Sequence, residues 1–156
     1  VLEYATRVVL GASSNFMFEA KLFEKRQERE LSVEELCELD SETQLASLGD
    51  ALDEGSLHPY RWAYVPHYYA ATFYNFPYTF GLLFGLGLYA QYQADPEPFK
   101  QGYDELLSMT GMGNAADLAA RFGIDLRNTA FWEASLDVLR ADVDKFMRLV
   151  DGQGSP

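Results

Sequence analysis

A stretch of 33 residues, 62–94, contains no Asp, Glu, Lys or Arg, and it constrains this chain more than any other feature. Charge is common elsewhere, since 23% of the 156 residues are charged, and seven of the ten tyrosines lie inside the stretch. Aromatic residues at this density imply a large buried interface or an open cleft. We therefore expect the rest of the chain to serve as a scaffold for residues 62–94.

The first half of this stretch combines a histidine with several phenols. Pro66 favours an extended conformation for the residue before it, so residues 62–65 are expected to form a strand or an irregular segment, and a helix should begin at or shortly after His67. Along one helix, His67, Tyr74 and Tyr78 are seven and then four residues apart, which predicts a common face. Pro77 removes a backbone donor, which predicts a kink or a delayed helix start there.

These residue types suit a particular chemistry. A neutral histidine and tyrosine hydroxyls can donate hydrogen bonds to an oxygen that becomes negative in a transition state, without adding a buried fixed charge. The alternative is an aromatic core helix whose phenols bond to the backbone. Both interpretations place the aromatic side chains on one face.

The remaining sequence predicts an all-α fold without β alternation. A capping box, Ser32 to Glu35, opens one helix, and Asn114 is a predicted N-cap for a short helix closed by Gly123. Further apolar residues at helical spacing predict helices over residues 2–29, from 99 towards Gly111, and from about 129 to 150, and the run from Asp95 to Pro98 is expected to end the helix that begins after His67. The inner side of that last helix should contain Trp132, Leu136, Leu139, Val143, Phe146 and Val150.

Net charge excludes some partners. At a formal charge of −12 the chain should be repelled by nucleic acid and by anionic lipid surfaces.

Cys37 is the one cysteine and has acidic neighbours, which disfavour a thiolate. One cysteine and no basic, apolar leader favour a reducing cytoplasm.

Several strings of residues resemble a known family. They are Pro66-His-Tyr-Tyr69, the run from Phe73 to Gly81, Phe18-Glu19 upstream, and the downstream residues Phe99, Tyr103, Leu106, Leu107, Gly111, Phe122 to Asp125, Phe131 and Trp132. Together they are similar to the C-terminal part of oligoendopeptidase F-type metallopeptidases, relatives of thimet oligopeptidase. The resemblance covers nearly the whole chain.

The resemblance implies a fold and an activity. It implies that residues 1–156 are a single all-α segment, the C-terminal helical part of a larger, cleft-containing metallopeptidase that hydrolyses short peptides. By resemblance, His67 and Tyr74 stabilise the tetrahedral intermediate as catalytic residues, and Tyr78 binds the substrate carbonyl. The expected partners are peptide substrates and the remainder of the peptidase polypeptide, with no nucleic acid and no membrane.

The zinc motif of the family, His-Glu-x-x-His with a later Glu, does not occur in this chain. His58 and His67 are the only histidines, and at nine residues apart they cannot form the i, i+4 pair of a helical zinc site. The resemblance implies a zinc cofactor in the complete enzyme whose ligands lie outside this chain. We therefore expect no metal site here and no activity from the chain alone.

Two alternatives stay open at this stage. Residues 62–94 could belong to a helical binding or membrane-associated module, although the strongly apolar part, 79–90, is shorter than the roughly 20 residues that span a bilayer. The chain could also be a piece of an inactive paralogue that keeps the scaffold.

Overall fold

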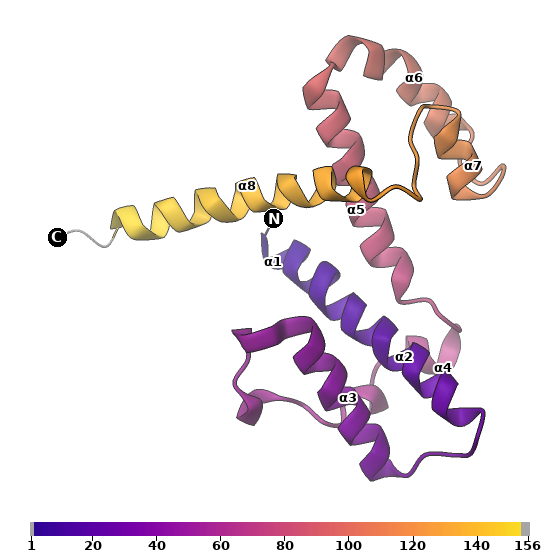
Figure 1. Ribbon diagram of the computed structural model, residues 1–156, viewed down its shortest axis with the longest axis vertical. Helices are drawn as coiled ribbons and strands as arrows, with labels where there is room; N and C mark the ends of the chain where they lie inside the picture. Colours follow the sequence, from indigo (N-terminus) through magenta and orange to yellow (C-terminus); the bar gives the residue numbers. More distant parts are fainter. Residues whose placement is uncertain (1, 154–156) are drawn as a thin grey trace. The chain divides into compact units, whose positions relative to one another are not determined.

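The computed structural model describes residues 2–153. The chain is 77% helical, and the described residues form no strand (Figure 1). The predicted all-α class is therefore confirmed. The chain divides into two compact units, Glu3–Phe80 and the part from Gly81 on, and the boundary falls inside helix α5. Each unit is described by itself below.

The first unit begins with an almost continuous helical segment. It consists of α1 (Leu2–Thr6), a π-helical turn η1 (Arg7–Gly11) and α2 (Ala12–Arg26). Helix α3 (Val33–Leu48) follows and lies beside α2 (Figure 1). The predicted helix over residues 2–29 is confirmed, with its end at Arg26.

The predicted capping box at the start of α3 is also confirmed. The Glu35 backbone N–H donates to Ser32 Oγ at 3.3 Å, and Glu35 Oε2 accepts from the Ser32 backbone N–H at 2.8 Å. Arg29 adds a two-pronged contact, with Nη1 and Nη2 donating to the two Glu35 oxygens at 2.8 and 2.6 Å. Hydrogen bonds from Arg29 and then from the Ser32 backbone lower the pKa of Glu35 to about 2.

The connection to the uncharged stretch is made of short turns. These are η2 (Gly49–Ala51), η3 (Glu54–Ser56) and η4 (Arg61–Ala63), so residues 62–65 form no strand. Helix α4 (His67–Ala70) begins at the predicted histidine.

The single helical face predicted for His67, Tyr74 and Tyr78 is wrong. Helix α4 ends at Ala70 and α5 (Phe76–Ala94) starts only at Phe76, so the three residues do not share one helix. The delayed start predicted from Pro77 is confirmed, because proline fits the first turn of a helix, where its missing N–H costs nothing.

The second unit contains the rest of α5 and three further helices. They are α6 (Pro96–Ser108), α7 (Ala115–Ala120) and α8 (Thr129–Gln153). Asn114 caps α7 as predicted, with Oδ1 accepting from the Asp117 backbone N–H at 2.9 Å. Gly123 follows α7 with φ of 74°, in the left-handed region that favours glycine.

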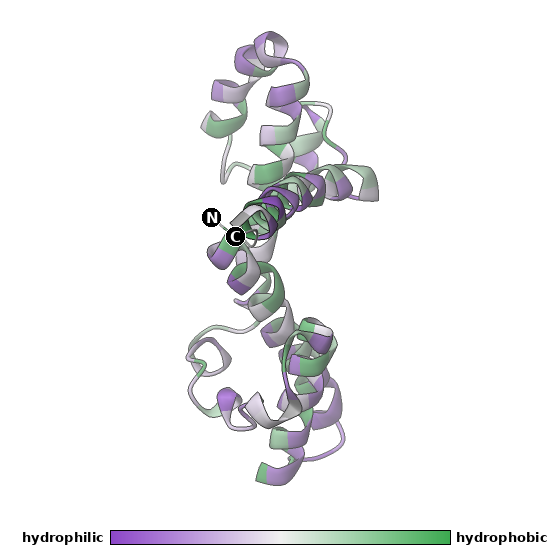
Figure 2. Ribbon diagram, turned by 90° about the vertical axis from the view of Figure 1, so that its left-hand side faces the viewer, coloured by the Kyte–Doolittle hydropathy of each residue, from purple (hydrophilic) through white to green (hydrophobic). Residues whose placement is uncertain are grey.

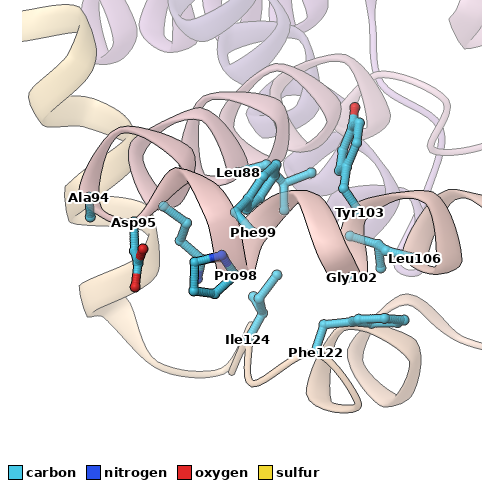
Figure 3. Close-up of a pocket in the computed structure, with 11 residues that line it drawn as sticks. Leu88, Ala94, Asp95, Pro98, Phe99, Gly102, Tyr103, Leu106, Phe122 and Ile124 are labelled. Atoms are coloured by element: carbon cyan, nitrogen blue, oxygen red, sulfur yellow. The ribbon is translucent and has the colours of Figure 1, made fainter.

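A small core holds the second unit together. Leu88, Leu106, Ala119 and Ile124 are buried, and Phe99, Phe122 and Phe131 are among the aromatic residues packed around them. A cavity of about 410 Å³ opens beside this core, and Figure 3 shows its lining of mainly apolar side chains from α5, α6 and the segment after α7. Its lining includes none of the three predicted site residues.

Only part of the predicted inner side of α8 is covered. Val143, Phe146 and Val150 are exposed, because the core of the second unit reaches α8 near Phe131 and not its C-terminal half. Figure 2 shows hydrophobic and hydrophilic residues interleaved along the helices. Among the described residues, no helix combines the length and the apolar character that crossing a membrane requires.

Gly87 of α5 packs tightly against α8. A Cβ at this position would lie 2.3 Å from Cζ of Phe131 and 2.7 Å from Oγ of Ser135. Overpacking a tight contact costs about 1–3 kcal/mol. We expect Gly87→Ala to lower the free energy of unfolding of this chain by about that amount, measured by urea unfolding.

Gly85 provides the matched control in the same helix. A Cβ there meets nothing within 4 Å, so Gly85→Ala should gain about 0.5–1 kcal/mol of unfolding free energy, because alanine favours the helix. Equal stability of the two variants would contradict the close packing of Gly87 against α8.

Candidate functional site

Two buried carboxylates fix the segment of the first unit that contains His67. The first is Asp40 of α3, whose side chain is fully buried. Arg61 Nε and Nη2 donate to Asp40 Oδ1 at 3.2 and 2.8 Å, and the Trp62 backbone N–H donates to Oδ2 at 2.9 Å. Arg61 Nη2 also donates to Ser14 Oγ of α2 at 2.7 Å. Asp40 therefore ties residues 61 and 62 to α3, and Arg61 adds a tie to α2 through Ser14.

The second buried carboxylate is Glu19 of α2, which is 1% exposed. Its Oε1 accepts from the Phe73 backbone N–H at 2.7 Å, and its Oε2 accepts from Nδ2 of Asn75 at 3.1 Å. Asn75 is itself 1% exposed. The segment between Arg61 and Asn75 is thus held near both ends, with α4 and His67 between them.

This arrangement gathers the three predicted site residues. The ring centroid of His67 lies 5.3 Å from that of Tyr74 and 5.5 Å from that of Tyr78, and the two phenol rings are 5.8 Å apart in an edge-on arrangement. Tyr74 is 50% and Tyr78 43% exposed. Phenols and an imidazole at these exposures are accessible to a ligand.

One hydrogen bond links the histidine to a phenol. Tyr78 Oη lies 3.2 Å from His67 Nε2. When Nε2 is protonated, it donates to the Tyr78 oxygen and leaves the phenol proton free for a ligand oxygen. In the other tautomer, the phenol donates to Nε2.

A cavity of about 380 Å³ lies next to His67 and Tyr78. Both side chains line it, together with residues of α1, η1 and α2. Among the described residues Asn15, which also lines it, has a buried Oδ1 without a hydrogen-bond partner. The cavity therefore offers a phenol and an imidazole, whereas the Asn15 Oδ1 atom is buried beneath its wall.

Two neighbouring tyrosines have structural contacts instead. Tyr68 packs on the buried Phe18 with ring centroids 5.0 Å apart, and its hydroxyl donates to the Asn15 carbonyl at 3.2 Å. Burial raises the pKa of Tyr68, so its phenol stays protonated. The Tyr69 hydroxyl donates to the Trp62 carbonyl at 3.1 Å.

The described residues do not fit a zinc site. Within residues 2–153, no three His, Cys, Asp or Glu side chains lie close enough together to hold a metal ion. His58 is exposed, and its ring contacts Tyr64.

Sequence reasoning missed the two carboxylates as parts of this site. A signal was present for Glu19, which is the only acidic residue between Glu3 and Glu24 and follows the apolar run from Phe16 to Phe18. Asp40 gave no such signal, because it lies in an acidic helix where most carboxylates are solvated.

Comparison with known proteins gives one positive result. The model of one protein family, described as peptidase family M3, matches residues 12–138, which include both carboxylates and all three predicted site residues. Searches of curated proteins and of solved structures gave no match.

Proposed function

Because the chain belongs to peptidase family M3, we propose that it supplies oxyanion-stabilising and substrate-binding side chains to a metallopeptidase of the oligoendopeptidase F type. His67 and Tyr74 are the proposed catalytic residues, and Tyr78 the proposed substrate-binding residue. The proposal rests on one observation above all, the mutual contact of these three side chains beside a cavity.

The proposed chemistry is electrostatic. When a peptide bond is attacked by water, its carbonyl oxygen becomes an oxyanion, and donors aimed at that oxygen lower the barrier. The Tyr74 hydroxyl and an N–H of His67 are suitable donors because neither adds a fixed negative charge. Tyr78 turns its hydroxyl proton from His67 Nε2 to a carbonyl oxygen of the substrate, which leaves the single N–H of a neutral His67 for the oxyanion.

The cavity chemistry supports peptides as the substrate class. A peptide backbone presents carbonyl acceptors, and the Tyr78 hydroxyl and the His67 ring that line the cavity can donate hydrogen bonds to them. The cavity of about 380 Å³ is in the range of small-ligand pockets, which favours short peptides.

Zinc belongs to this proposal as a property of the family, whose members are generally zinc-dependent. Since the described residues do not fit a metal site, the ligands and the base that activates water are proposed to lie in the remainder of the peptidase polypeptide. The chain is accordingly proposed to be a C-terminal all-α segment of that enzyme, working on peptides in the cytoplasm.

The test compares this chain with the complete protein. We expect the complete protein to contain stoichiometric zinc, to cleave short peptides and to stop when a chelator removes the metal, because zinc activates water in this chemistry. The chain alone should neither contain stoichiometric zinc nor cleave peptides. Metal analysis and a quenched fluorescent peptide assay measure both properties.

Stoichiometric zinc in the chain alone, lost on replacement of His58 and His67, would contradict the assignment of the metal ligands to the rest of the enzyme. A complete protein that binds peptides without cleaving them would favour an inactive paralogue.

A further inference from the structure

Tyr74 lies in a backbone bend that its own sequence does not favour. The five residues from Ala71 to Asn75 join α4 to α5, and Phe73 in their centre has φ of 54°. A bulky residue rarely adopts this left-handed conformation, because its Cβ approaches the following carbonyl oxygen. Such a conformation persists only where surrounding contacts impose it.

Glu19 makes those contacts on both sides of Tyr74. Its two oxygens accept from the Phe73 backbone N–H, which precedes Tyr74, and from the Asn75 side chain, which follows it. The contact with Phe73 is short, at 2.7 Å, as is typical of a hydrogen bond to a charged acceptor. One side chain of α2 therefore holds the backbone immediately before Tyr74 and the side chain of the residue immediately after it.

The same contacts orient the start of α5. The Asn75 carbonyl accepts from the Tyr78 backbone N–H at 3.4 Å, in the first turn of the helix. The position of Asn75 therefore influences the positions of both Tyr74, which precedes it, and Tyr78, whose backbone N–H it binds. Both phenols depend on the bend that Glu19 holds.

Glu19 itself is unsuited to react with a substrate. It is 1% exposed, and both of its oxygens already have donors. A buried carboxylate costs free energy unless it is hydrogen-bonded, so these bonds are what allow it to stay in the interior.

We propose that Glu19 is a positioning residue, which holds the bend around Phe73 and Asn75 so that Tyr74 lies against His67. This inference rests on the proposed function only for its consequence in catalysis. The position of Tyr74 beside His67 can be tested by structural measurements on this chain, with no enzymatic assay.

The decisive variant is Glu19→Gln, which keeps the shape of the side chain. A glutamine has one acceptor and one donor at its end, so it cannot accept from both Phe73 N–H and Asn75 Nδ2, and the Asn75 amide must turn over to keep its bond. In NMR spectra of the chain we expect the cross-peaks between the His67 and Tyr74 rings to disappear or to weaken about fivefold or more, because the ring contact at 5.3 Å is lost.

In the complete protein, Glu19→Gln should lower kcat by about tenfold to a hundredfold with KM changed less than about threefold, since misplacing a catalytic group costs mainly turnover. Glu24→Gln, the same change at an exposed position of α2, is the matched control and should leave the cross-peaks and kcat as in the wild type.

A complementary swap keeps the test decisive where Glu19→Gln fails to fold. In the double variant Glu19→Gln/Asn75→Asp, the glutamine amide donates to the new carboxylate while its oxygen still accepts from Phe73 N–H. We expect this variant to restore the cross-peaks. The wild-type chain offers a further measurement, because the Phe73 amide should exchange slowly with solvent.

A folded Glu19→Gln variant that keeps the cross-peaks at wild-type strength would overturn the inference, and so would a Phe73 amide that exchanges freely. Loss of the cross-peaks with unchanged kcat supports the positioning by Glu19 and instead removes Tyr74 from the proposed mechanism. The two failures are therefore distinguishable.

Discussion

Replacement of Tyr74 with phenylalanine is expected to lower kcat of the complete peptidase about a hundredfold or more, the cost of removing one oxyanion donor. The substitution deletes one hydroxyl and keeps the ring that contacts His67 and Tyr78. Because Tyr74 is half exposed, the loss of packing should be small. Steady-state kinetics on a short peptide, with zinc content and melting temperature measured in parallel, test this result.

Two further tyrosines serve as controls for Tyr74. Tyr78→Phe should have a milder effect on kcat and a larger one on KM, if this phenol chiefly binds the substrate carbonyl. Tyr60 is 53% exposed and does not line the cavity, so Tyr60→Phe should leave turnover within about twofold of the wild type. Full turnover of Tyr74→Phe with a lower melting temperature would mean that the aromatic cluster is only packing.

The ends of several helices could be predicted from the sequence, because capping residues and proline near each end determine them. The capping box at Ser32, the cap at Asn114 and the late start of α5 at Phe76, next to Pro77, each depend on residues within one turn of the feature. Such signals act over three or four residues and are visible in a single sequence. Most helix boundaries were therefore predicted to within a few residues.

The candidate site was predicted for a reason that the structure corrects. Helical spacing suggested one face for His67, Tyr74 and Tyr78, but the helix is interrupted between Ala70 and Phe76. The side chains meet because the chain bends between them. Two of the hydrogen bonds that hold this bend come from Glu19, 54 and 56 residues away in sequence, and no local periodicity can reveal them.

The two buried carboxylates, Glu19 and Asp40, could not be predicted from the amino-acid composition. The sequence has 24 acidic residues, and Asp40 does not stand out among its acidic neighbours, while Glu19 differs only in having no other acidic residue nearby in the sequence. What distinguishes both is the set of donors that surrounds them, Arg61 and Trp62 for Asp40 and the bend residues for Glu19. Partners this far apart in sequence become evident only in three dimensions.

His67→Ala is expected to lower kcat of the complete peptidase about a hundredfold or more, since it removes an oxyanion donor. It also removes the ring against which both phenols pack and the hydrogen-bond partner of Tyr78 Oη. Zinc content should stay unchanged, because His67 belongs to no metal cluster among the described residues. Kinetics, metal analysis and circular dichroism on the same preparation check the three statements.

Conservative and distant replacements sharpen the test of His67. His67→Gln keeps an amide donor near the position of the ring nitrogen and should retain more turnover than His67→Ala, whereas His58→Ala removes an exposed histidine and should be silent. If His67 and Tyr74 act on one oxyanion, the combined variant should lose less than the product of the two single effects, since groups that work as a unit are not additive. Strict multiplication of the two losses would mean that the two side chains act on different steps.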